Sequence, residues 1–122
     1  PWYIRLKNDK PFVFAGLYDR WRDPDDGSVL PTCAIITTRA NPLLEKIHNT
    51  KKRMPVILHS DTESEWIGSD LSPERSGQLF LPFPEDQLHA HPVSKKLIRA
   101  ETSPGDPDII RPFDHTSPGK LF

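Results

Sequence analysis

Short apolar stretches separated by polar turns predict strands at the start of the chain. Residues 1–7 alternate between apolar and polar side chains, and residues 8–10 (Asn-Asp-Lys) are typical of a tight turn. Residues 11–18 continue with apolar and aromatic side chains. The pattern therefore predicts a β-hairpin over residues 1–18. Gly16 inside the second strand indicates a bulge or a close approach of another backbone segment.

Three further stretches predict strands. Residues 31–38 are β-branched and apolar, which makes them the best candidate for a central strand. Cys33 lies in this stretch, and we expect it to be a small, buried apolar side chain. Residues 53–58 predict a strand with a proline near its start. Residues 88–98 have strand character interrupted by Pro92.

Capping signals predict three short helices between these strands. Asn41 is typical of an N-cap and Pro42 of a first helical position, for a helix that ends near Ile47. Residues 60–66 predict a short acidic helix, and residues 72–80 predict another that opens on Ser-Pro. The mixture of short strands and short helices indicates an α+β or mostly β fold.

Composition narrows the protein class. A length of 122 residues corresponds to one domain, and neither a repeat nor a linker marks a second one. Fourteen prolines exclude long helices. The apolar runs are far shorter than the ~20 residues of a membrane span, and no secretory leader opens the chain. A single cysteine excludes a disulfide framework and a zinc site built from thiolates.

The end of the chain differs from the rest. Residues 1–98 are expected to form the core of the single domain, and residues 99–122 a C-terminal tail rich in proline, glycine and aspartate. From residue 102 onward, these residue types favour a segment that follows the protein surface. We expect a soluble, cytoplasmic protein.

Charge is segregated along the chain although the formal net charge is only −1. Residues 39–53 carry five basic side chains against one acidic side chain, Glu45. Residues 61–70 carry four acidic side chains and no basic one. The basic stretch can present cations to phosphates, or it can be a solvated loop; composition alone leaves both interpretations open.

Three histidines are candidates for chemistry. His48 precedes the basic run, and neighbouring cations lower the proton affinity of a histidine, which suits a group that accepts and returns a proton near neutral pH. A polar surface role is the alternative for His48. His89 and His91 share one face of a strand, a spacing compatible with metal binding, but the sequence offers no evident third ligand.

Residues 48–58 (His-Asn-Thr-Lys-Lys-Arg-Met-Pro-Val-Ile-Leu) carry a more specific signal. A histidine followed closely by Arg-Met-Pro and an apolar strand resembles the signature of the SOS-response-associated peptidase (SRAP) family. In many members the arginine follows the histidine by two residues, whereas four residues intervene here, which indicates a subfamily with a longer basic loop. The segments that support the resemblance, in the family's order, are residues 1–4, 14–21, 34–41 and 91–94. The resemblance spans residue 1 to about residue 98.

The resemblance implies both a fold and a function. The implied fold is α+β, with a mostly antiparallel, barrel-like sheet flanked by short helices. The implied function is a DNA-damage response in which family members form covalent crosslinks to abasic sites in single-stranded DNA. There an N-terminal cysteine attacks the open abasic sugar and closes a thiazolidine ring, assisted by an asparagine, a glutamate and a histidine. The family's autoproteolytic peptidase activity acts on residues before that cysteine.

The family's cysteine, asparagine and glutamate belong to the part of the domain that precedes the strand at Pro1. We therefore expect that an N-terminal part of the domain is missing from this chain. Cys33 cannot replace the family's cysteine, because the Cys33 nitrogen is an amide and cannot form an imine. A polypeptide of these 122 residues alone is expected to be inactive and to form no thiazolidine with abasic DNA.

The resemblance and the residue chemistry assign roles to what remains. His48 is the candidate general acid/base for opening the abasic sugar and for imine chemistry. Arg53 is expected to hold a phosphate through charge-assisted hydrogen bonds. Thr37 and Thr38 are expected to donate hydroxyl hydrogen bonds to the DNA backbone. The remaining predicted DNA contacts are Lys51, Lys52, Met54 and Pro55.

The expected partners are single-stranded DNA with abasic sites and the missing N-terminal segment of the same domain. We expect a monomer associated with the nucleoid, without a membrane contact, a cofactor or a metal. Two alternatives remain open. One is a degenerate stand-alone module that binds single-stranded DNA and has lost the nucleophile. The other is an unrelated metal- or protein-binding β domain, in which His89 and His91 would matter.

Overall fold

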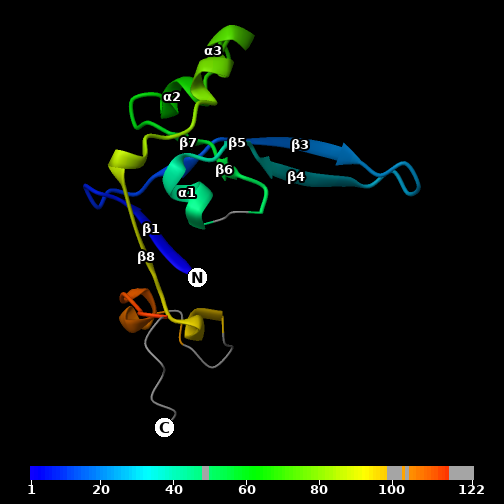
Figure 1. Ribbon diagram of the computed structural model, residues 1–122. Helices are drawn as coiled ribbons and strands as arrows, with labels where there is room; N and C mark the ends of the chain where they lie inside the picture. Colours follow the sequence, from blue (N-terminus) through cyan, green and yellow to red (C-terminus); the bar gives the residue numbers. More distant parts are fainter. Residues whose placement is uncertain (48–49, 99–102, 104, 116–122) are drawn as a thin grey trace. The chain divides into compact units, whose positions relative to one another are not determined.

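The computed structural model describes residues 1–47, 50–98, 103 and 105–115 (Figure 1). The strands are β1 (Trp2–Leu6), β2 (Val13–Phe14), β3 (Gly16–Arg22), β4 (Val29–Ile35), β5 (Thr37–Arg39), β6 (Arg53–Pro55), β7 (Ile57–Leu58) and β8 (Leu88–Pro92). The α-helices are α1 (Pro42–Ile47), α2 (Glu63–Trp66) and α3 (Pro73–Leu79). Short 3-10 helices are η1 (Glu85–Gln87), η2 (Lys95–Ile98) and η3 (Pro107–Ile110).

The chain divides into two compact units. The first unit consists of Pro1–Lys10 and Asp86–Phe122, and the second of Pro11–Glu85. In the described part of the chain, every strand pair is antiparallel and every sheet has two strands. The fold is therefore mixed α and β with antiparallel strand pairs and short helices, as predicted, and no closed barrel is formed by the described residues.

The first unit is built on the pair β1–β8, in which Trp2 lies opposite Pro92 and Leu6 opposite Leu88. The described part of the C-terminal tail packs along the end of β8. Val93 and Pro112 form an antiparallel bridge, and the N–H of Phe113 donates to the carbonyl of Pro92 over 2.9 Å. These two contacts hold Pro112 and Phe113 beside the end of β8, while the division into a core over residues 1–98 and a tail over residues 99–122 stays a prediction.

The second unit is organised by a three-way junction of Ala15, Ile36 and Val56. The N–H of Ala15 donates to Val56, the N–H of Val56 to Ile36, and the N–H of Ile36 to Ala15, each over 2.9 Å. Each of these residues separates two short strands, so that the chain changes its pairing partner there. As a result, the pairs β3–β4, β5–β6 and β2–β7 all begin at this junction.

The core of the second unit surrounds the junction. Ala15 and Val56 are fully buried, and Leu58 is nearly so. The partly buried side chains packed against them are Ile36, Trp66, Leu79 and Phe80. Gly16 follows the junction, and a Cβ there would lie 3.2 Å from the carbonyl oxygen of Ala34. The prediction of a close backbone approach at Gly16 is therefore confirmed.

The predicted hairpin over residues 1–18 is wrong. A turn does follow β1, where the N–H of Asp9 donates to the carbonyl of Leu6 over 3.1 Å. However, β1 pairs with β8, and β2 pairs with β7. Pro11 has no N–H to donate to a ladder, and the N–H of Lys7 is already bonded to the carbonyl of Gln87. Local turn chemistry therefore did not determine the pairing.

The predicted central strand over residues 31–38 is also wrong in two respects. The stretch forms two strands, β4 and β5, which the junction residue Ile36 separates. All residues of β4 are exposed, and β4 pairs only with β3 (Figure 1). Cys33 lies on β4 and is accordingly exposed instead of buried.

The three predicted helices are present. Asn41 caps α1 as expected, and Ser72 caps α3 by accepting from the N–H of Arg75 over 3.2 Å. Thr62 precedes α2 without a side-chain capping bond. Within the described residues, none of the helices has the length and apolar character needed to cross a membrane.

Candidate nucleic-acid interface

The pair β5–β6 brings most of the predicted DNA contacts together. In its register, Thr37 lies opposite Pro55, Thr38 opposite Met54, and Arg39 opposite Arg53. Directly opposed residues of an antiparallel pair point to the same face, and the face alternates along each strand. One face of the pair therefore carries Thr37, Arg39, Arg53 and Pro55. We call these four residues the arginine face.

Two guanidinium groups share the arginine face. Arg39 and Arg53 are directly opposed in register, and both are exposed. Like charges in this arrangement repel each other. Neither arginine forms an ion pair with a carboxylate anywhere in the described part of the chain. The face consequently holds two adjacent cations that an external anion can neutralise.

Thr37 orients one of these cations. Arg53 Nε donates to Thr37 Oγ1 over 2.9 Å, and Arg53 Nη2 donates to Thr37 Oγ1 over 2.6 Å and to the carbonyl of Thr37 over 3.0 Å. Among the described residues, Nη1 of Arg53 has no partner, so its two N–H groups are available to a ligand. The hydroxyl of Thr37 accepts both bonds and can still donate its own proton, in line with the role predicted for it.

The opposite face of the pair supports the structure. Met54 is only 1% exposed, and its sulfur accepts the N–H of Asn41 over 3.4 Å. The predicted contact between Met54 and DNA is therefore wrong, because the side chain is in the core. Thr38 is half-buried and opposes Met54, so it does not share the arginine face. Pro55 does lie on the arginine face and is half-buried.

Asn41 forms hydrogen bonds between this buried face of β5–β6 and other parts of the second unit. Its side-chain oxygen accepts the N–H of Leu44 over 2.8 Å, which caps α1. Its side-chain nitrogen donates to the carbonyl of Phe83 over 2.7 Å. Asn41 is 5% exposed, so both bonds are protected from water. The sequence predicted the cap but carried no signal for the bond to Phe83.

The basic loop is partly neutralised by α1. Lys52 Nζ lies 2.7 Å from Glu45 Oε1. The hydrogen bond to Glu45, and then the charge of Glu45, raise the pKa of Lys52. The Lys52 side chain is 66% exposed and the Glu45 side chain 41% exposed, so this pair is weak and can exchange for a phosphate. Lys51 is exposed in the turn before β6.

The predicted catalytic residue, His48, lies outside the described residues. Ile47, which directly precedes it, is the last residue of α1. The role of His48 as a general acid/base remains a prediction.

The acidic stretch lies on and around α2. Glu65 forms a two-pronged ion pair with Arg75, with Nε to Oε1 at 2.5 Å and Nη2 to Oε2 at 2.8 Å. The hydrogen bond from Arg75, and to a lesser degree its charge, hold the pKa of Glu65 below its ordinary value. Asp61, Glu63 and Asp70 leave the stretch acidic, so it does not favour phosphate binding.

His89 and His91 lie in the first unit on β8. Their facing nitrogens, Nε2 of His89 and Nδ1 of His91, are 3.4 Å apart, and His91 Nε2 lies 2.8 Å from the carbonyl of Ile110. A carbonyl only accepts, so His91 donates from Nε2 and helps to hold the tail. No group of three or more potential metal ligands occurs among the described residues.

Sequence reasoning did not single out Arg39 as a candidate site residue, although it counted Arg39 within the basic stretch. The available signal was the strand period: once β5 and β6 are paired, Arg39 and Arg53 fall opposite each other.

Comparison with known proteins gives consistent matches. A family model described as SOS response associated peptidase (SRAP) matches residues 1–100. "Abasic site processing protein YoqW" of Bacillus subtilis (strain 168) is 43% identical over 111 residues, which cover 90% of this chain and 47% of that protein. "Abasic site processing protein HMCES" of Xenopus tropicalis is 33% identical over 83 residues, which cover 67% of this chain and 24% of that protein.

A solved structure shows the same fold. The crystal structure of a protein from Bacteroides thetaiotaomicron superposes with a TM-score of 0.81 at 38% sequence identity. The match covers 93% of this chain and 48% of that chain. The chain thus spans about half the length of YoqW and of this solved relative.

Proposed function

Because the chain belongs to the SOS response associated peptidase family, we propose that it takes part in the response to DNA damage by binding single-stranded DNA at abasic sites. The arginine face of β5–β6 binds the phosphates. Family membership also overturns the alternative of an unrelated metal- or protein-binding β domain. The names of the relatives YoqW and HMCES, both abasic site processing proteins, support this assignment.

The observation that carries the proposal is the opposed pair Arg39 and Arg53. Two exposed arginines lie directly opposite each other in register without a carboxylate partner among the described residues, and Thr37 fixes the orientation of the Arg53 guanidinium. A phosphate removes the repulsion between the two arginines and accepts charge-assisted hydrogen bonds from both. Contacts to phosphates do not depend on the base sequence, which suits a protein that must bind wherever a base is lost.

The covalent step is proposed for the whole SRAP domain. In this chemistry the abasic sugar opens to an aldehyde. The amine of an N-terminal cysteine, which lies in the N-terminal part of the domain in the family, condenses with that aldehyde to an imine and releases water. The thiol of the same cysteine then adds to the imine carbon and closes the thiazolidine. His48 is the residue of this chain that we assign to proton transfer during ring opening and imine formation. Autoproteolysis before that cysteine, the peptidase activity of the family name, is likewise proposed for the whole domain.

We also propose the wider architecture and setting. The three antiparallel pairs that begin at the Ala15–Ile36–Val56 junction are parts of a barrel-like sheet in the whole domain. The whole domain acts as a monomer in the cytoplasm, on the nucleoid.

Fluorescence anisotropy tests the proposal. A labelled single-stranded oligonucleotide with one abasic site is titrated with the protein at low and at moderate salt. We expect binding that weakens as salt rises and that unlabelled single-stranded DNA competes away. Absence of binding at low salt would contradict the proposal. A stable adduct formed by these 122 residues alone would contradict the assignment of the nucleophile to the family's other part.

A further inference from the structure

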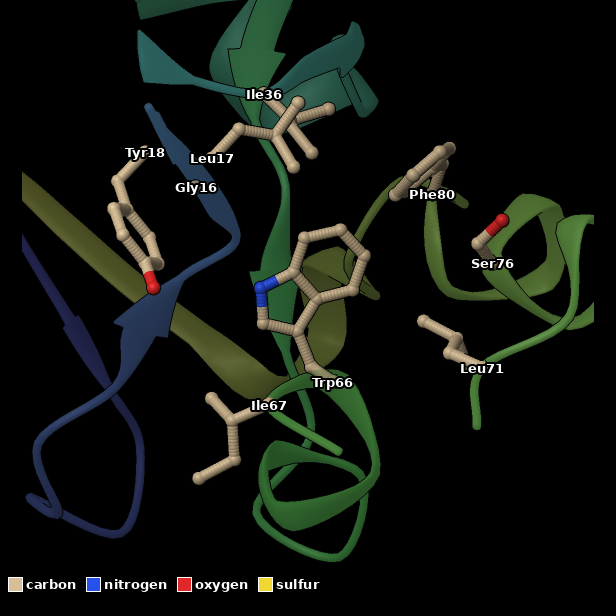
Figure 2. Close-up of a pocket in the computed structure, with 9 residues that line it drawn as sticks. All are labelled: Gly16, Leu17, Tyr18, Ile36, Trp66, Ile67, Leu71, Ser76 and Phe80. Atoms are coloured by element: carbon tan, nitrogen blue, oxygen red, sulfur yellow. The ribbon is translucent and has the colours of Figure 1, made fainter. Parts of the chain in front are cut away.

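An apolar groove surrounds Trp66 in the second unit. Its volume is about 530 Å³, and the side chains that form most of its wall are Leu17, Tyr18, Ile36, Ile67, Leu71 and Phe80. Figure 2 shows the indole of Trp66 at the centre, with Tyr18 on one side and Phe80 and Leu71 on the other. Tyr18 is 87% exposed and Ile67 84% exposed, which is unusual for side chains of this size.

The hairpin β3–β4 extends this apolar surface. Every residue of both strands is exposed. Leu17 and Trp21 on β3 share a face with Leu30, which lies opposite Trp21 on β4. A two-stranded hairpin without a covered face is at best marginally stable in water. On this face Asp19 and Thr32 separate Leu17 from Trp21 and Leu30, so large exposed apolar side chains stand at both ends of it. Exposed apolar side chains gathered in this way beside an apolar groove and rimmed by polar residues mark an interaction site.

The nature of the occupant follows from charge and from length. The acidic stretch around α2 flanks the groove and repels the phosphates of a nucleic acid, so a nucleic acid does not fit. YoqW and the solved relative are each about twice as long as the matched region, and the match to the solved relative covers 93% of this chain. Each of these two relatives therefore contains about as much polypeptide again outside the matched region, and exposed apolar surface of the matched region is where such polypeptide can pack.

We infer that the Trp66 groove and the adjoining Leu17–Trp21–Leu30 face form the interface for the segment that SRAP relatives carry outside the region matched here. The partner is an apolar polypeptide segment that inserts side chains around Trp66 and covers one face of β3–β4. The same groove and face would receive the segment whether it is joined to this chain or is a separate polypeptide. It rests on family membership and not on DNA binding.

Co-expression with a relative tests the interface. The probe is the part of B. subtilis YoqW outside its 111 matched residues, tagged and co-expressed with the untagged 122-residue chain. The groove variant is Ile67→Lys, and the matched control is Ile98→Lys, since Ile98 is 78% exposed and lies in the first unit. Co-purification, light scattering and titration measure the complex and its dissociation constant.

We expect a one-to-one complex that Ile67→Lys weakens by about tenfold or more, because an unpaired ammonium would be buried in an apolar contact. Ile98→Lys should change the dissociation constant by less than about twofold, as for a surface site away from the contact. Equal binding by both variants would overturn the inference. A homodimer of this chain would also overturn the inference if Ile67→Lys dissociated it and the YoqW segment did not displace it.

A chimera gives a second readout if the YoqW segment cannot be purified alone. The 122-residue chain replaces the matched region of YoqW, and thermal unfolding is recorded. We expect one cooperative transition whose midpoint Ile67→Lys lowers by about 5 °C or more and Ile98→Lys does not. Two independent transitions, or equal midpoints, would overturn the inference. Because no DNA is present, failure here leaves the proposed DNA binding untouched.

Discussion

Both oxygen atoms of Thr37 accept hydrogen bonds from the guanidinium of Arg53. Thr37 lies two positions before Arg39, the residue directly opposite Arg53 on the neighbouring strand. Three hydrogen bonds of 2.6–3.0 Å fix Nε and Nη2 and leave Nη1 without a partner in the described part of the chain. A flexible arginine loses side-chain entropy when it binds a phosphate, and this pre-orientation reduces that loss. Thr37 thus acts on the phosphate through Arg53 as well as through its own hydroxyl.

Replacing Thr37 by valine should weaken DNA binding without unfolding the protein. Valine keeps the β-branched shape and the carbonyl bond to Arg53, but it removes the hydroxyl that accepts from Nε and Nη2. A loss of about 0.5–1.5 kcal/mol in binding free energy is expected for a bond of this kind. Anisotropy titrations of Thr37→Val, Arg53→Ala and the double variant measure it. If the two effects simply add, Thr37 does not act through Arg53.

Replacing Glu45 by glutamine should strengthen binding. Glu45 occupies Lys52 through an exposed ion pair and raises the pKa of Lys52. Replacing the carboxylate frees the Lys52 ammonium for the phosphates and removes one charge that repels them. The dissociation constant for DNA should therefore fall by a few fold at low salt, which is a gain of about 0.5–1 kcal/mol in binding free energy. The gain should vanish at high salt because exposed charges are screened. Glu74→Gln on α3 serves as the control, and an equal gain there would make the effect one of net charge only.

Replacing Asn41 should reduce the stability of the second unit. Asn41→Ala removes the cap of α1 and leaves the buried carbonyl of Phe83 without its donor, a loss of about 2–4 kcal/mol. Asn41→Asp keeps an acceptor for the N–H of Leu44 but cannot donate to Phe83. Ser72→Ala removes an exposed cap alone and should lose only about 1 kcal/mol. Denaturant unfolding measures all three, and an Asn41→Ala loss no larger than that of Ser72→Ala would contradict the dual role.

Local features of this fold could be predicted from the sequence. Asn41 and Pro42 marked the start of α1, and Ser72 marked the start of α3, because capping depends on residues close in sequence. The Arg-Met-Pro block located β6. The strand period would have separated Arg53 from the buried Met54, but both were predicted as DNA contacts.

Long-range pairing could not be predicted. The turn over residues 8–10 suggested a hairpin over residues 1–18. Instead, β1 pairs with β8, which lies more than eighty residues away in the sequence. The stretch over residues 31–38 has the composition of a central strand, but its break at Ile36 depends on backbone bonds to Ala15 and Val56. Cys33 is exposed for the same reason: the apolar character of β4 does not reveal whether a neighbouring strand covers it.

Replacing His48 by alanine should slow the covalent step and leave binding intact. In the whole SRAP domain, a general acid/base lowers the barrier by about 10²–10⁴-fold in rate and contributes little to ground-state affinity. The rate of crosslink formation or reversal should also lose the limb of its pH profile that this histidine provides. The alternative is that His48 stabilises the end of α1 through the helix dipole. In that case the variant would keep its rate and lose about 1 kcal/mol of stability, which thermal unfolding detects.

The salt dependence of DNA binding tests the central claim most directly. The logarithm of the association constant for an abasic single-stranded oligonucleotide is measured against the logarithm of salt concentration for the wild type, Arg53→Ala and the control Arg20→Ala. Arg20 is exposed on β3, which belongs to the pair β3–β4 and not to β5–β6. If the face holds a phosphate, Arg53→Ala should reduce the slope by about 0.7, the value of one contact to a single strand, and Arg20→Ala should leave it unchanged. An unchanged slope for Arg53→Ala would contradict the account, because the basic stretch would then be a solvated surface.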